Sequence, residues 1–209
     1  MKLIVLGATG LVGSHVLEMA LNDVRVGHVL APVRHPITPH PKLSAPVIDF
    51  KNLPEGGDFW KADAVICALG TTMKKAGSRD AFRFADYTLP LAVARLASAS
   101  GTPVWVLNSA VGASDRSRFV YNRIKAELEQ DLSTLGFSSL TLVRPSVISG
   151  NRSEFRTGER IMIVGLRLIS PFISRRWHPV SAENIARTML NAALEPVPGK
   201  TVVQSEQML

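Results

Sequence analysis

The chain has 209 residues, of which 46% are hydrophobic, 20% charged and 6% aromatic, and its formal net charge at pH 7 is +7. This length and composition suit one globular domain with a mainly aliphatic core, and no low-complexity stretch or linker divides it. The single cysteine, Cys67, excludes an intrachain disulfide, and the scatter of arginines along the chain argues against a nucleic-acid partner.

Two apolar segments bear on localisation. The five apolar-leaning residues before Gly7 are too few for the apolar region of a signal peptide. The segment 161–173 carries Arg167 and Pro171 and is shorter than the roughly 20 residues that a membrane-spanning helix needs. We therefore expect a cytoplasmic protein with no membrane span.

Short β-rich runs alternate with helical patterns along the chain. In chain order we expect a strand at 3–6, a helix at 9–21, strands at 28–33, 46–50 and 63–68, a helix at 83–100, a strand at 103–107, a helix at 119–135, a strand at 140–143, a helix at 182–194 and a strand at 201–204. The strands do not alternate between apolar and polar residues, which is typical of a parallel sheet covered on both faces. The sequence thus predicts an α/β fold with a doubly wound parallel sheet in a single domain, 1–209, with a small C-terminal lobe at 151–180 on the substrate side.

The motif "GATGLVG", residues 7–13, joins the first expected strand to the first helix. Gly7 permits a tight turn, Gly10 lets the backbone approach a pyrophosphate, and Gly13 lets the helix pack against the strand. The N–H groups and the dipole at the helix start favour an anionic phosphate. A plain strand–turn–helix would need none of these three glycines at this spacing, so we predict a dinucleotide site.

The end of the second expected strand indicates which dinucleotide binds. An acidic residue there would hold the 2′-hydroxyl of NAD, but the sequence reads "LAPVRHP", with Arg34 and no acid. A guanidinium matches the geometry of a phosphate, so Arg34 favours NADP over NAD. The alternative is that Arg34 is a solvated surface residue.

Three residues further along the chain have the chemistry of a proton-transfer site. Ser109 follows the fifth expected strand, and Tyr121 and Lys125 share one face of the following helix in "YNRIK". An ammonium near a phenol lowers the phenol pKa, so the phenol exchanges a proton more readily near neutral pH. A serine hydroxyl can hydrogen-bond the same substrate oxygen.

With these residues in view, the sequence resembles the short-chain dehydrogenase/reductase superfamily, whose fold is the Rossmann fold. It is most similar to the short, atypical branch that includes the Tat-interacting protein family. The resemblance covers residues 1–195 and rests on "GATGLVG", "CALGTTMKKAGS", "NSAVGAS", "YNRIKAELE", "LVRPSVISGNR" and "RRWHPVSAENIARTML".

The resemblance implies roles for individual residues toward an NADP cofactor. The pyrophosphate would lie against Gly7, Thr9, Gly10, Leu11, Val12 and Gly13. The adenosine half would meet Arg34, Asp49, Phe50, Ala68, Leu69 and Gly70. The nicotinamide half would meet Tyr121, Lys125, Pro145, Ser146 and Val147.

The resemblance also implies that Tyr121 is the acid/base, that Lys125 assists it, and that Ser109 orients a carbonyl. Many enzymes of the superfamily add an Asn to a proton relay on the helix after the fourth strand. This chain reads "RFADYTLP" there, with Asp86 and Tyr87 but no Asn, which puts the relay in doubt.

Three functions follow from these observations. The first is an NADP(H)-dependent oxidoreductase that transfers hydride to or from a small-molecule carbonyl or alcohol. The second is a dinucleotide-sensing regulatory protein with little turnover, and the third is an epimerase that holds NAD, against which Arg34 argues. We expect no metal, because the five histidines show no metal-ligand spacing. The arginines of 151–180 fit either an anionic ligand or a solvated face, and a homodimer through 119–135 is open.

Overall fold

The computed structural model describes residues 1–55, 58–149 and 175–209. Its main sheet has seven parallel strands in the order β3-β2-β1-β4-β5-β6-β9. The strands are β1 (Lys2–Leu6), β2 (His28–Leu30), β3 (Leu43–Ser44), β4 (Ala64–Cys67), β5 (Val104–Asn108), β6 (Ser139–Arg144) and β9 (Gly199–Gln204). Strand order reverses between β1 and β4, which pair from Leu3↔Ala64 to Leu6↔Cys67. This confirms the predicted α/β fold with a doubly wound parallel sheet.

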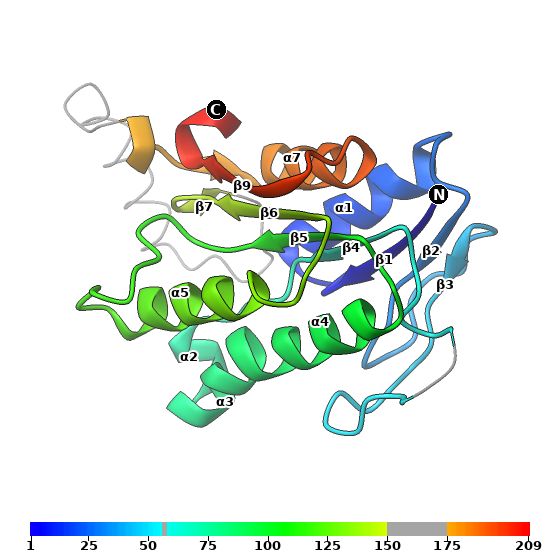
Figure 1. Ribbon diagram of the computed structural model, residues 1–209, viewed down its shortest axis with the longest axis horizontal. Coiled ribbons are helices and arrows are strands. Elements are labelled where there is room, and N and C mark those ends of the chain that lie inside the picture. Colours follow the sequence, from blue (N-terminus) through cyan, green and yellow to red (C-terminus); the bar gives the residue numbers. More distant parts are fainter. Residues whose placement is uncertain (56–57, 150–174) are drawn as a thin grey trace.

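Helices cover both faces of the sheet (Figure 1). One face carries α1 (Leu11–Asn22) and α7 (Ala182–Leu194), and the other carries α4 (Leu89–Ala99) and α5 (Val120–Leu132). Shorter helical segments are α2 (Met73–Ala76), α3 (Arg79–Arg83), a π-helix (Phe84–Thr88) and 3-10 turns at Arg175–Trp177 and Ser205–Met208. A separate pair of two-residue strands joins β7 (Ile148–Ser149) to β8 (Val180–Ser181).

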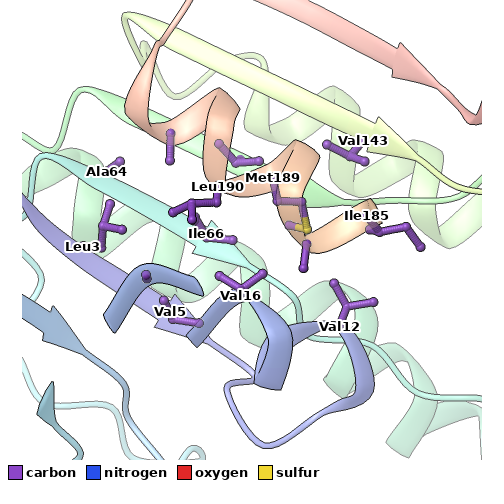
Figure 2. Close-up of a cluster of buried hydrophobic side chains, with 14 of the residues drawn as sticks. Leu3, Val5, Val12, Val16, Ala64, Ile66, Val143, Ile185, Met189 and Leu190 are labelled. Atoms are coloured by element: carbon purple, nitrogen blue, oxygen red, sulfur yellow. The ribbon is translucent and has the colours of Figure 1, made fainter. Parts of the chain in front are cut away.

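The core is divided by the sheet, because successive strand residues point to opposite faces. Leu3 and Val5 pack with Val16 of α1 and Met189 of α7, as Figure 2 shows. Ile4 and Leu6, which alternate with them, belong to the cluster under α4 and α5. All of β1 is therefore held between two apolar layers, and the turn that follows it has a rigid base.

The third strand differs from the prediction. It lies at Leu43–Ser44 rather than at 46–50, and Val33 and Val47 form only an isolated bridge. Pro32 and Pro46 have no N–H to donate, so the ladder at this edge of the sheet cannot continue regularly. Asp49 and Phe50 consequently follow the isolated bridge at Val47 and not the end of a regular strand.

The helix predicted at 83–100 is broken into three parts. Leu89 N–H donates to the carbonyl of Phe84, five residues back, within the π-helix. Pro90 has no N–H for the carbonyl of Asp86, and its ring would clash with that carbonyl in a regular α-helix. The π turn accommodates the proline and turns Asp86, which is 0% exposed, into the protein.

Part of the C-terminal prediction lies outside the described residues. The lobe expected at 151–180 falls largely on 150–174, so it stays a prediction. Within 1–55, 58–149 and 175–209, no helix is both long and apolar enough to cross a bilayer. The same ranges contain no group of three or more His, Cys, Asp or Glu side chains placed to bind a metal ion.

Candidate active site

A cleft of about 1080 Å³ opens where β1, β4, β5 and β6 end. Ligands of doubly wound sheets bind at this edge, where the strand order reverses. Fifteen of the residues predicted from the sequence line the cleft: Gly7, Thr9, Gly10, Leu11, Val12, Arg34, Phe50, Ala68, Leu69, Gly70, Ser109, Tyr121, Lys125, Pro145 and Ser146. The structure therefore brings the glycine motif and the Tyr/Lys pair to one cavity.

The glycine turn is shaped by close backbone contacts. Gly7 has φ +79°, a conformation that other residues rarely adopt, and its carbonyl accepts a 2.9 Å hydrogen bond from Gly10 N–H. A Cβ on Gly13 would lie 2.0 Å from the Gly7 carbonyl oxygen. Gly13 therefore lies under the turn and not in the cleft, and its role is to let α1 approach β1.

The start of α1 fits a phosphate group. The N–H groups of Leu11, Val12 and Gly13 lie in the first turn, where no intrahelical carbonyl can accept them. The N-cap residue, Gly10, provides no side chain to cap them, and a Cβ there would approach the Gly7 oxygen to 3.2 Å. A bare backbone surface with free N–H groups at the positive end of a helix suits a pyrophosphate.

Lys125 is held in a buried ion pair at the opposite end of the cleft. Its Nζ lies 2.9 Å from Oδ1 of Asp86, and the two side chains are 2% and 0% exposed. The ammonium also donates to the Asn108 carbonyl at 3.4 Å. The second carboxylate oxygen of Asp86 accepts a 2.8 Å hydrogen bond from Thr71 N–H, which ties the loop after β4 to the π-helix.

Tyr121 lies beside this ion pair, with Lys125 Nζ 6.0 Å from the centre of its ring and the Phe82 ring packed against it. Burial raises the pKa of Tyr121 above its ordinary value, the Lys125 charge opposes this rise, and the Asp86 charge adds to it. The net direction is upward, whereas the sequence led us to expect a lowered pKa. The difference arises chiefly because the sequence does not show how far Tyr121 is buried, and secondly because it does not show that Lys125 has a carboxylate partner.

Lys125 itself remains an ammonium ion. Burial alone would lower the pKa of Lys125, but the charge of Asp86, the proximity of Tyr121 and the hydrogen bond to Asp86 together raise it. Its positive charge is therefore present and balanced by a negative one.

Ser109 is engaged in a second buried network. Its hydroxyl donates to Oε1 of Glu129 at 2.5 Å, and Glu129 forms an ion pair with Arg144, whose Nε lies 2.9 Å from the same oxygen. Ser109 and Glu129 are each 3% exposed. The single hydroxyl hydrogen of Ser109 is thus directed away from the cleft, so orienting a carbonyl would require Ser109 to give up Glu129.

Two further predicted residues do not line the cleft. Asp49 is exposed, and its carboxylate accepts hydrogen bonds from Lys51 N–H and the Asn52 amide. Val147 is 39% exposed, and its carbonyl accepts the N–H of Val180. Ser146 does line the cleft, but its hydroxyl donates to the His178 carbonyl and is not free for a ligand.

Sequence reasoning missed Glu129 and Arg144 and left Asp86 without a role. Glu129 follows Tyr121 and Lys125 by further intervals of four in "YNRIKAELE", so its place on the same face of α5 was available from the spacing. Its partner, Arg144, ends β6. The inward direction of Asp86 depends on the π-helix, and Pro90 is the one indirect signal of that π-helix in the sequence.

Comparison with known proteins relates the whole chain to one set of relatives. No protein-family model matches it. The chain is 32% identical to "Protein fmp52, mitochondrial" of Aspergillus clavatus, over 97% of this chain and 91% of the relative. It is 31% identical to the Fmp52 protein of Eremothecium gossypii, over 100% and 96%. The chain belongs to the Fmp52 family. The expectation of a cytoplasmic protein is wrong, because these Fmp52 relatives are named as mitochondrial proteins.

Solved structures share the fold of this Fmp52 family member at low identity. MoeE5, in complex with UDP-glucuronic acid and NAD, has a TM-score of 0.74 and 16% identity over 97% of this chain and 75% of its own. A short-chain dehydrogenase/reductase superfamily protein from Agrobacterium tumefaciens with bound NAD has a TM-score of 0.69 and 15% identity over 98% and 77%. These similarities establish a Rossmann fold.

Proposed function

We propose that the protein is a nicotinamide-dinucleotide-dependent oxidoreductase that transfers hydride to or from a small-molecule carbonyl or alcohol. The observation that carries the proposal is the convergence of the glycine turn, Tyr121 and Lys125 on one cleft. If the cleft only bound a phosphate, the glycine turn would not need Tyr121 and Lys125 beside it. MoeE5 and the Agrobacterium tumefaciens protein, which share this fold, have NAD bound, and this supports the same class of cofactor here.

The residues divide the work between the two ends of the cleft. The turn at 7–13 would hold the pyrophosphate through backbone N–H groups, and Lys125 would bind a ribose hydroxyl. A bound nicotinamide would supply the hydride chemistry. Tyr121 would exchange the proton with the substrate oxygen, and the Phe82 ring packed against it would hold the phenol ring in place.

We further propose a preference for NADP over NAD. Arg34 is exposed and lines the cleft, just beyond the bridge that joins Val33 to Val47. A guanidinium there can pair with a 2′-phosphate, which NAD lacks. The alternative role, a solvated arginine, predicts no discrimination between the two dinucleotides.

A dinucleotide-sensing protein with little turnover is the second candidate. The Ser109 network favours it, because the hydroxyl that would orient a carbonyl already donates to Glu129. Both candidates require dinucleotide binding, so only turnover separates them.

The motifs that this chain shares with the Tat-interacting protein branch support its membership of that branch. Its segment "CALGTTMKKAGS" contributes Gly70, Thr71, Thr72, Met73 and Lys75 to the cleft. We propose this placement within the superfamily, with 151–180 as the substrate-side lobe.

The test is a thermal-shift comparison of NADP and NAD, followed by a screen of carbonyl and alcohol substrates with the favoured dinucleotide. Stabilisation by NADP at lower concentration than by NAD, together with substrate-dependent oxidation of the reduced form, is the expected result. Binding without turnover on any substrate would support the sensing protein. No stabilisation by either dinucleotide would contradict both candidates.

A further inference from the structure

Asp86 occupies a position in the site for which the proposed function has no role. The π-helix turns its carboxylate inward, where it is 0% exposed and touches both Lys125 and Thr71 N–H. A carboxylate excluded from water is costly unless it is paired and hydrogen-bonded, and here it is both. A Cβ on Gly70 would make only ordinary contacts, 3.5 Å from Asp86 Oδ1 and 3.9 Å from Lys125 Nζ, so the ion pair does not depend on a glycine there.

Among the described residues, Lys125 and Asp86 are the charged groups that act on the pKa of Tyr121. Lys125 faces it from its own helix, and Asp86 faces it from the π-helix. Lys125 also faces the Cys67 thiol of β4, whose pKa burial raises to about 11, so the thiol stays neutral at ordinary pH. The cation and the anion lie 2.9 Å apart, so their opposite effects on a phenol oxygen largely cancel. Burial then decides, and it favours the uncharged phenol.

We propose that Asp86 is a positioning residue that holds Lys125 and balances its charge, so that Tyr121 is a proton donor at neutral pH and the site works in the direction of carbonyl reduction. The inference rests on the proposed function and deepens it. It also accounts for the missing relay Asn, because a charged carboxylate in that region fixes the lysine directly and not through a relay.

Reduction of a carbonyl substrate requires one hydride and one proton. The carbonyl carbon receives a hydride from a reduced nicotinamide dinucleotide, which is oxidised. The carbonyl oxygen takes the proton of the Tyr121 hydroxyl as the O–H bond breaks, which gives the alcohol and a tyrosinate beside Lys125. Solvent returns a proton to the tyrosinate before the next turnover. Alcohol oxidation would need the tyrosinate at the start, so it should require alkaline pH.

The test follows the ionisation of Tyr121 directly, without substrate or dinucleotide. The chain has two tyrosines, and Tyr87 keeps a pKa of about 12 through its hydrogen bond to Asp131 and its burial. Tyr87→Phe makes Tyr121 the sole tyrosine, and its near-ultraviolet tyrosinate absorbance can be titrated against pH. In this background we expect a midpoint above the usual value of about 10.

Asp86→Asn in the same background keeps one oxygen, which can accept from either Lys125 or Thr71 N–H, and removes the negative charge. The phenolate then becomes the anion nearest to the ammonium, so the midpoint should fall by about one to three pH units. The matched control is Asp131→Asn, which removes a carboxylate from α5 that does not touch Lys125 and should leave the midpoint unchanged. An unchanged or higher midpoint in Asp86→Asn would overturn the proposal.

A second variant keeps the proposal testable if Asp86→Asn does not fold. Lys125→Met, also in the Tyr87→Phe background, leaves Asp86 unbalanced and should move the midpoint upward. A downward shift or none would overturn the charge account. These titrations are independent of catalysis, so a protein that binds no dinucleotide would refute the proposed function while the midpoints still decide the role of Asp86.

Discussion

The two ends of the cleft differ in the groups that they present, backbone atoms at one end and side chains at the other. The glycine end, residues 7–13, is one continuous stretch that presents backbone N–H groups and glycine Cα atoms. The tyrosine end, formed by Ser109, Tyr121, Lys125 and Asp86, gathers side chains from the end of β5, from α5 and from the π-helix. Each charged group at that end depends on a buried partner distant in sequence.

The difference shows how the two ends should respond to change. Backbone N–H groups do not titrate, so phosphate binding at the glycine end should depend little on pH and more on whether the turn can close. At the tyrosine end, the protonation of each group is set by its neighbours, so one substitution should alter several groups at once. The following predictions separate the two ends, beginning with the largest expected effect.

Tyr121→Phe should break the tyrosine end and spare the glycine end. The substitution removes one oxygen, and turnover should fall by about 10²–10⁴-fold, the usual contribution of general acid–base catalysis. Dinucleotide affinity should be retained, because the pyrophosphate contacts are elsewhere. Steady-state kinetics and dinucleotide titration of the same preparation measure the two effects, and undiminished turnover would leave the sensing protein as the better account.

Glu129→Gln tests how far the tyrosine end depends on buried charge. Glu129 is 4% exposed in its ion pair with Arg144, and the loss of its charge leaves a partly buried guanidinium without a counter-ion. Breaking a buried ion pair lowers the free energy of unfolding by about 3–5 kcal/mol. The upper part of that range applies to pairs in which both side chains are completely buried. Urea unfolding measures it.

The matched control is Glu127→Gln on the same helix. Glu127 pairs with Arg83, but these side chains are 42% and 43% exposed, so the expected cost is about 0–1 kcal/mol. Equal losses in the two variants would show that the Ser109 network contributes no more than a surface pair.

Arg34→Ala should act only on the adenosine side of the cleft. If Arg34 pairs with the 2′-phosphate, NADP binding should weaken by about 1.5–3 kcal/mol, the range for a hydrogen bond to a charged group. NAD affinity should change little, because NAD has no phosphate at this position. Calorimetric titration with both dinucleotides tests this, and an equal loss for both would contradict a phosphate role.

Gly13→Ala should strain the glycine end through packing alone. The added Cβ would lie 2.0 Å from the Gly7 carbonyl oxygen, so α1 or the turn must move. Overpacking of this kind costs about 1–3 kcal/mol, measured by thermal or urea unfolding, and dinucleotide binding should weaken with it. Gly27→Ala is the control, since its Cβ would lie 3.9 Å from the nearest backbone oxygen, and it should leave both stability and binding nearly unchanged.

Much of the fold and of the glycine end was predictable because the relevant information is local. The order of strands and helices follows from apolar runs and their periods, and a glycine turn is specified by its own seven residues. The predicted strand at 46–50 was wrong for a local reason too, because the effect of Pro32 and Pro46 on the ladder was not weighed. The spacing of Tyr121 and Lys125 also predicted that they share one face of a helix, and both residues line the cleft.

By itself, then, the sequence determined the doubly wound fold, the glycine turn between β1 and α1 and the residue types available for proton transfer. The tertiary structure alone decided the state of those residues. Asp86 and Lys125 are 39 positions apart in the sequence, and Ser109 and Glu129 are 20 positions apart, yet the two residues of each pair are in contact. Such contacts depend on how the π-helix, α5 and the strand ends pack together. The same packing buries Tyr121, which raises its pKa, and directs the Ser109 hydroxyl toward Glu129.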